Sequence, residues 1–170
     1  MRQFKRMLAG MLFLMLAIGG ASTVLAQDAA TPVAGGAITF EFVEQGVGEV
    51  HLDLGEPGVS VGDRYVFRNP IIDEASGESL GHTAGTCDVT DVKDGVEQYY
   101  ACSYLISLPD GVVAVTGEYD AVNGTADLFV VGGSGGYEGA TGVCAYTTVK
   151  VEGKDWNLEF PTTLTITLAR

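Results

Sequence analysis

The segment from Gly132 to Gly136 reads GGSGG and matches the G-x-S-x-G pattern of a serine nucleophile. In that pattern the serine stands on a sharp turn between a strand and a helix, where its hydroxyl can attack a carbonyl group. From Tyr137 onwards, however, the residues alternate as in a strand, and the segment lacks the Gly-Lys-Ser/Thr ending of a phosphate-binding loop. We therefore expect a glycine-rich turn here.

The chain contains two histidines, His51 and His82, and its nearest approach to a metal-ligand pattern is His51-x-Asp53. Zinc sites and the facial triad of non-haem iron need three or four ligands in a characteristic arrangement. Two histidines at unrelated positions do not supply such a set. We therefore expect both histidines to be surface residues, and we predict no metal site.

The pairing of the cysteines can be predicted from a hairpin. The dipeptide Asp94-Gly95 is typical of a two-residue type I′ turn, because Asp and Gly tolerate the positive φ that both turn positions need. Cys87 precedes this turn by as many residues as Cys102 follows it, so the two cysteines should face each other across paired strands. Such close neighbours can meet disulfide geometry. We predict a Cys87–Cys102 disulfide, with Cys144 as the free thiol.

The elements that must position these residues read as strands. Val, Thr, Tyr and Phe recur in short alternating runs bounded by Gly, Asp, Asn and Pro, and no segment carries a convincing helical period. In the last run, Leu164, Ile166 and Leu168 alternate with threonines, which gives the strand one apolar face. The pattern predicts strands over residues 38–44, 49–54, 65–71, 83–92, 97–108, 112–119, 126–131, 137–151 and 158–168.

Short turns join several of these strands. Asn123-Gly124 is a second two-residue hairpin signal, and Pro109-Asp110-Gly111 is a tight turn. Strands joined so closely run antiparallel, and eight or nine of them in one small domain close most naturally into an up-and-down barrel. We predict an all-β fold, a closed antiparallel barrel of about eight strands. A sandwich of two sheets is the structural alternative.

The N-terminus has the pattern of an export signal. Three basic residues within the first six precede an apolar run over residues 7–18 and a small-residue stretch that ends at Ala26. The apolar run is shorter than a bilayer span needs, and a retained anchor is the alternative. We predict a signal peptide over residues 1–26, a flexible linker over 27–36, a single domain over 37–170, and secretion of the mature protein.

The composition is acidic. The formal net charge is −13 at pH 7, and loss of the basic signal would make the mature chain more negative. The acidic residues are scattered along the chain instead of forming a binding tract. Such a surface is a poor partner for nucleic acid and for anionic membranes. We predict no nucleic-acid partner, and no membrane partner after signal cleavage.

Four segments, taken in order, resemble the sequence patterns of plant allene oxide cyclases. They are residues 62–69 (GDRYVFRN), 81–87 (GHTAGTC), 115–119 (VTGEY) and 130–142 (VVGGSGGYEGATG). The last segment also resembles a glycine-rich signature of dirigent proteins. The resemblance extends from about Phe40 to Leu168, so it covers nearly all of the predicted domain.

This resemblance implies an eight-stranded barrel, a homotrimer, an apolar cavity and no cofactor. Cyclases of the family steer the ring closure of an unstable allene oxide, which is an intramolecular isomerisation, and dirigent proteins steer the coupling or cyclisation of reactive phenolic intermediates. A cofactor-free cyclase or dirigent-like protein for a small, mostly apolar, oxygenated intermediate is therefore expected. The alternative is a non-catalytic, secreted binding barrel that carries a small apolar ligand.

The resemblance also assigns candidate site residues. The cyclase's strand-one glutamate falls on Glu41, its cavity asparagine on Asn69 and its cavity tyrosine on Tyr119. In such a cavity the carboxylate would face developing positive charge and the two donors would hold an oxygen atom. The walls would hold the substrate in one conformer, which replaces lost entropy with positioning.

Three further residues are expected to bind the ligand. The family's cavity cysteine falls on Cys87. Tyr65 and Phe67 share one face of a predicted strand, because successive side chains alternate between the two faces.

Placing Glu41 in the cavity has a consequence for its neighbours. Because side chains alternate, Phe40 and Phe42 would face outward and would need a cover. The alternative is that these two aromatic residues lie in the core and that Glu41 is a solvated strand residue. We expect the trimer to supply it. Val43 stands where the cyclases carry a second asparagine, two residues after the glutamate.

Overall fold

A computed structural model describes residues 36–152 and 158–168 of the chain. The predicted signal peptide and the linker up to residue 35 lie outside the described residues. Within the described ranges the secondary structure consists of strands, and no helix is present that could cross a membrane. The all-β prediction is confirmed.

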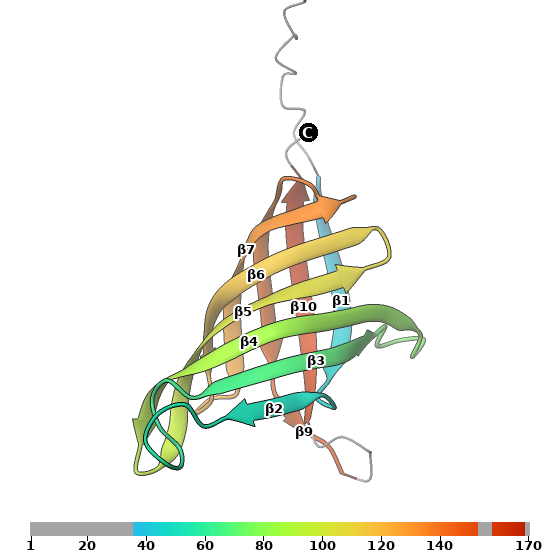
Figure 1. Cartoon of the computed structure of the whole chain (residues 1–170). Coiled ribbons are helices and arrows are strands. Elements are labelled where there is room, and N and C mark those ends of the chain that lie inside the picture. Colours follow the sequence, from blue (N-terminus) through green and yellow to red (C-terminus); the bar gives the residue numbers. More distant parts are fainter. Residues whose placement is uncertain (1–35, 153–157, 169–170) are drawn as a thin grey trace, which may run out of the picture. The chain divides into compact units, whose positions relative to one another are not determined.

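Ten strands follow one another within the described ranges. Figure 1 shows how these strands wrap around the molecule. Each predicted strand overlaps an observed one, and the predicted strand over 137–151 is divided into β8 and β9. In chain order the strands are β1 (Ala37–Gln45), β2 (Glu49–Leu52), β3 (Arg64–Ile72), β4 (Ser79–Lys93), β5 (Val96–Leu108), β6 (Gly111–Asp120), β7 (Thr125–Gly135), β8 (Ala140–Thr147), β9 (Val149–Lys150) and β10 (Leu158–Leu168).

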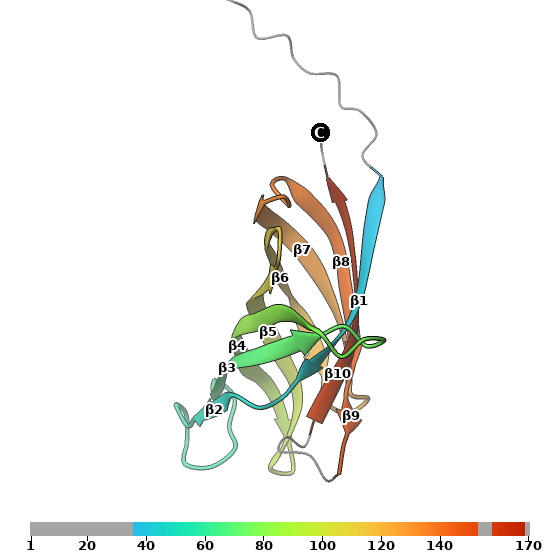
Figure 2. The ribbon, with the colours of Figure 1, turned by 90° about the vertical axis from the view of Figure 1, so that its right-hand side faces the viewer.

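Eight of these strands form a closed antiparallel barrel. Around the wall the order is β1, β10, β8, β7, β6, β5, β4 and β3, and each strand pairs antiparallel with the next. β1 and β3 close the ring, with Val43 opposite Ile72 and Glu44 opposite Ile71. The short strands β2 and β9 extend β3 and β10, and Figure 2 shows this wall from the side. The barrel prediction is confirmed, and the sandwich is excluded.

The β4–β5 hairpin has the predicted register. Asp94 and Gly95 have φ values of 54° and 77°, as a type I′ turn requires. Cys87 lies opposite Cys102, and their sulfur atoms form a disulfide 2.06 Å long. Cys144 is a buried free thiol. The predicted pairing of the cysteines is therefore present in the structure.

The β6–β7 connection differs from the predicted two-residue hairpin at Asn123-Gly124. Residues 121–124 form a four-residue turn instead. The carboxylate of Asp120 accepts hydrogen bonds from the backbone N–H groups of Val122 and Asn123, at 2.9 and 3.0 Å. An aspartate before the turn thus stabilises a longer loop than the Asn-Gly pair alone would form.

Most of the GGSGG segment is strand, where a turn was expected. β7 continues to Gly135, and the turn follows over residues 136–139. A Cβ atom at Gly133 would lie 2.3 Å from the carbonyl oxygen of Tyr137, so this close approach requires glycine. Ser134 is exposed and is followed by a turn and β8. A nucleophile elbow, which needs a helix after the serine, is excluded here.

Aliphatic side chains fill one end of the barrel, where β1 begins and β10 ends. Ile106, Val113, Leu164 and Ile166 are completely buried there. Their burial follows from the alternation of side chains along each strand, which turns every second residue inward. The opposite end of the barrel is lined by larger, polar-tipped aromatic side chains and contains the candidate site.

Candidate active site: an aromatic cavity with a buried glutamate

A cavity of about 260 Å³ opens at the end of the barrel away from the aliphatic core. Most of its lining is aromatic, and its polar lining residues include Asn69 and two glutamates, Glu44 and Glu49. No lysine, arginine or histidine is among the described residues that line it. The aromatic lining residues are Tyr65, Phe67, Tyr100, Tyr104, Tyr119, Tyr146 and Phe160.

Five of these rings form a continuous series, which we call the aromatic belt. Ring centroids lie 5.7 Å apart for Tyr65 and Tyr100, and 5.5 Å apart for Tyr100 and Tyr119. The series continues to Tyr146 at 5.7 Å and to Phe160 at 5.6 Å. Contacts of this kind fix ring positions through edge-to-face and offset packing. The belt spans β3, β5, β6, β8 and β10, so it forms a preformed wall.

Glu44 is the carboxylic acid buried in this wall. It lies on β1 with the same parity as Phe40 and Phe42, so its side chain points into the barrel and is 7% exposed. The Asn69 side-chain amide donates a hydrogen bond of 2.7 Å to Oε1 of Glu44. Burial raises the pKa of Glu44 to about 7, although hydrogen bonds from Asn69 and Thr83 act in the opposite direction.

Asn69 also shapes the chain between β1 and β2. Its Oδ1 accepts hydrogen bonds from the backbone N–H groups of Val47 and Gly48, at 3.2 and 3.0 Å. A Cβ atom at Gly48 would lie 2.4 Å from the carbonyl oxygen of Arg68, so the close approach of these two backbone segments requires glycine. With its oxygen held in this way, the Asn69 amide nitrogen must face Glu44.

A second carboxylate, Glu97, organises the belt from the side of β5. The hydroxyls of Tyr65 and Tyr100 donate to its two oxygen atoms, each at 2.7 Å. Burial and these bonds to an anionic partner raise the pKa of both tyrosines. Glu49 on β2 also has a raised pKa, because of burial and repulsion from Glu97. The cavity therefore gathers negative charge among aromatic rings.

The free thiol lies behind the cavity lining. Cys144 is completely buried and is hydrogen-bonded to Tyr104, whose ring packs against Phe67 at 5.5 Å. Burial raises the pKa of Cys144 to about 12. A thiol protonated at neutral pH is a poor nucleophile, so this cysteine serves packing.

The structure brings five of the six predicted site residues together at the cavity. Asn69, Tyr119, Cys87, Tyr65 and Phe67 all line it. The Tyr119 hydroxyl lies 2.9 Å from Oγ1 of Thr148.

Glu41 is the exception, and its predicted inward orientation is wrong. It is exposed on the outer face of β1, whereas Phe42 is 2% exposed inside the barrel. Phe40 is half-buried and packs its ring against Tyr137 at 5.9 Å. Burial of two aromatic rings outweighs burial of one carboxylate, so the phenylalanines take the inner face. Their outward position, which was expected to support a trimer, is also wrong.

Glu44, the buried acid three residues after Glu41, was not predicted from the sequence. Glu44 shares strand parity with Phe40 and Phe42, and this signal could have identified it. Glu97 and Tyr100 were missed as well, since their approach to Tyr65 depends on how three strands curve around the barrel. Both histidines lie outside the lining: His51 is exposed and His82 is half-buried. Among the described residues, no group of His, Cys, Asp and Glu side chains could hold a metal ion.

Comparison with known proteins agrees with this architecture. The family model of the allene oxide cyclase barrel-like domain matches residues 44–159. Among curated proteins, none matches the chain.

Solved structures share the fold at low sequence identity. A pyocyanin demethylase is 19% identical, with a TM-score of 0.60 over 75% of this chain and 99% of that chain. The pterocarpan synthase dirigent protein GePTS1 is 9% identical, with a TM-score of 0.66 over 82% and 89% of the two chains. The Diels Alderase AbmU from Streptomyces koyangensis is 16% identical, with a TM-score of 0.59 over 79% and 69%. At these identities the likeness shows the fold alone.

Proposed function

The chain belongs to the allene oxide cyclase barrel-like family, and on that premise we propose that it is a cofactor-free cyclase or dirigent-like protein. Its cavity binds a small, mostly apolar, oxygenated intermediate and steers the cyclisation or coupling of that molecule. Because one barrel fold can host unrelated activities, the proposal depends on the site as well as on the family.

The observation that carries the proposal is Glu44. A carboxyl group is rarely retained in an aromatic cavity unless it has a task, because burial of its charged form is costly. Its pKa of about 7 allows the group to be a proton donor or a negative charge near neutral pH. Asn69 holds the carboxyl in one orientation through the 2.7 Å hydrogen bond.

In the proposed mechanism the cavity acts first through shape. The aromatic belt holds the conjugated intermediate in one folded conformer. Its two reacting ends then meet through one defined face of each, which sets the stereochemistry of the product. Positive charge that develops during ring closure is stabilised by the Glu44 carboxylate, without reorganisation of solvent. Tyr119, which lies in the belt and lines the cavity, contacts the oxygenated part of the intermediate.

Two of the three structural neighbours described above support the same class of chemistry. Proteins described as a dirigent protein and as a Diels Alderase share this fold. Both descriptions denote control of how a conjugated molecule joins to itself or to another. For the present chain such control is the proposed activity.

Three test reactions that give racemic product without protein can examine the proposal. They are ring closure of an allene oxide generated in situ, an intermolecular [4+2] cycloaddition, and coupling of an oxidised phenol. We expect wild-type protein to give an enantiomeric excess in at least one reaction, and Glu44→Gln to lose most of it. Glu118→Gln is the matched control, since Glu118 is an exposed glutamate on the outer face of β6.

Two outcomes would contradict the catalytic proposal. Racemic product in all three reactions would do so, as would an enantiomeric excess that survives Glu44→Gln in the folded variant. If native mass spectrometry of protein from its own host then finds a retained small apolar molecule, the carrier function is favoured instead.

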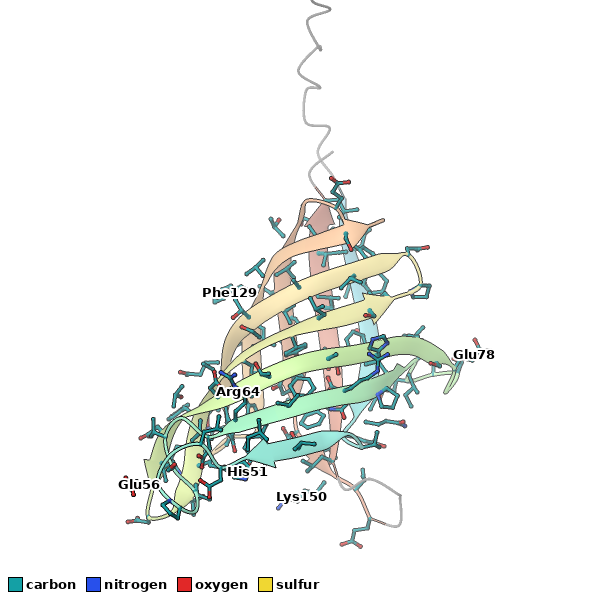
Figure 3. The ribbon with its side chains drawn as sticks, in the orientation of Figure 1. His51, Glu56, Arg64, Glu78, Phe129 and Lys150 are labelled. Carbon is teal, nitrogen blue, oxygen red and sulfur yellow. A yellow bond between two sulfur atoms is a disulfide. The ribbon has the colours of Figure 1, made fainter. Side chains whose placement is uncertain are left out.

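We also propose secretion after cleavage at Ala26 and assembly into a homotrimer. The export-signal pattern and the family resemblance support these two points. An apolar pair on the outer wall, Phe129 opposite Val143, offers surface that copies could cover, because the two residues are 64% and 52% exposed. Figure 3 shows Phe129 on the outside of the barrel. Intact mass of the exported protein and light scattering test the two points.

A further inference from the structure

We infer that the cavity selects its occupant by charge: it accepts a planar, conjugated cation and disfavours a carboxylate. This inference rests on the proposed function, because it concerns the same cavity, and it names the substrate class more narrowly. It is drawn from the side chains that line the cavity and from the hydrogen bonds that they already make.

Four of the five tyrosine hydroxyls that line the cavity already have a partner within the protein, and Tyr146 has none among the described residues. Tyr65 and Tyr100 both donate to the Glu97 carboxylate at 2.7 Å. The Tyr119 hydroxyl is paired with Thr148 at 2.9 Å. Beyond one bond from Tyr146, an anionic group that entered the cavity would have to displace these partners before a tyrosine could donate to it.

The acceptor groups, in contrast, have spare capacity. A carboxylate has about four lone-pair positions, and Glu97 uses two of them for the tyrosines. Glu44 receives one hydrogen bond from Asn69 and one from Thr83. The Glu49 side chain, which is exposed and lines the cavity, has no hydrogen-bond or ion-pair partner among the described residues. A guest that brings positive charge would therefore meet two incompletely paired carboxylates in the lining, with Glu97 bonded to two of the lining tyrosines.

Electrostatics favours the same guest. Glu49 is repelled by Glu97, and Glu44 by Glu49, so the cavity carries uncompensated negative potential when these groups ionise. The described lining contains no basic side chain that could balance this potential or bind a carboxylate. A cation relieves the repulsion, whereas an anion increases it at an effective dielectric well below that of water.

The aromatic belt also favours a planar cation. A delocalised cation is attracted to the faces of tyrosine and phenylalanine rings, and a planar one can stack on them. Consecutive rings from Tyr65 to Phe160 lie 5.5–5.7 Å apart, so a planar guest can contact several faces at once. The volume of about 260 Å³ limits the guest to a small ring system.

A charge series of two-ring probes tests the inference. The probes are 1-methylquinolinium (positive), 1-methylnaphthalene (neutral) and 1-naphthoate (negative), and the measurement is equilibrium dialysis against the full-length exported protein. We expect affinity to fall in that order, with the cation roughly tenfold or more tighter than the anion. Glu49→Gln and Glu97→Gln should each reduce this ratio severalfold. Glu118→Gln removes the same charge outside the cavity and should leave the ratio unchanged.

The outcomes separate this inference from the proposed function. Naphthoate binding as tightly as methylquinolinium, a ratio that responds equally to Glu118→Gln, or no binding of any probe would overturn the charge selection. Each can occur while Glu44→Gln still abolishes stereocontrol in the reaction assay, which would leave the proposed function standing. Conversely, the expected charge order combined with racemic products would support the inference and overturn the catalytic proposal.

Discussion

Two carboxylates are buried among the residues that the structure describes, and they differ in how many donors surround them. Asp63, at the end of the β2–β3 loop, has no exposed surface. Its oxygen atoms accept hydrogen bonds from the backbone N–H groups of Leu54, Gly55 and Ser60, at 3.0, 3.2 and 2.8 Å, and from the Ser60 hydroxyl at 3.1 Å. Burial raises its pKa, but these bonds outweigh burial and lower the pKa to about 2.

Glu44 is nearly as buried but receives fewer hydrogen bonds, from Asn69 and Thr83. Burial therefore prevails, and its pKa rises to about 7. The comparison shows that burial alone does not make a carboxylate reactive. A carboxylate saturated by backbone donors, such as Asp63, holds a loop. One with open lone pairs on a cavity wall, such as Glu44, remains available to a guest.

The largest expected effect is on the saturated carboxylate. Asp63→Ala leaves three backbone N–H groups without their acceptor, so we expect the melting temperature to fall by roughly 20 °C. Asp73→Ala is the control, because Asp73 accepts a backbone hydrogen bond of 2.7 Å from Ser76 in an exposed turn. Differential scanning calorimetry that finds equal losses in both variants would contradict the distinction.

The next effect concerns the pH dependence of stability. The pKa of Glu44 is about 7 in the folded state against an ordinary value of 4.5, so the proton that it binds stabilises the fold fully below pH 4.5. This contribution of about 3 kcal/mol is lost as pH rises through 7. Because Glu44→Gln cannot ionise, its stability relative to wild type should increase by about that amount between pH 4.5 and pH 8. Urea unfolding at the two pH values measures it, and a constant difference would show that Glu44 titrates normally.

The smallest expected effect sharpens the role of the donors. Asn69→Ala removes the 2.7 Å hydrogen bond to Glu44, which favours the charged carboxylate. We expect the titration midpoint of Glu44, followed by carboxyl ¹³C NMR, to rise by about one pH unit. Thr83→Val, nearly isosteric, should raise it less. A titration midpoint of Glu44 that falls or stays constant in both variants would contradict this role of the two donors.

The barrel was predictable because its elements rely on local rules. Alternation placed Leu164 and Ile166 inward, and the Asp94-Gly95 turn set the register that joins Cys87 to Cys102. That register holds at the cysteines because two irregularities near Asp91 offset each other, one on β4 and one on β5. No sequence rule predicts that the two irregularities would offset each other.

The site was predictable only in part, for two physical reasons. Matching the family's glutamate to Glu41 overrode the alternation rule, which places Glu44 on the same face as Phe42. The second reason is distance along the chain. The bonds of Tyr65 and Tyr100 to Glu97 depend on strand curvature and stagger, which no local pattern encodes.

The closure between β1 and β3 consists of two residue pairs, one of which contains Glu44. The other neighbouring strands of the wall share six or more pairs, so the ring is held least firmly at this seam. We therefore expect local opening of the barrel to begin beside Glu44, where each opening would let water reach the carboxyl. While the seam is open, Glu44 behaves as an ordinary glutamate and releases its proton. The protonation state of Glu44 would thus differ between the closed and the opened barrel.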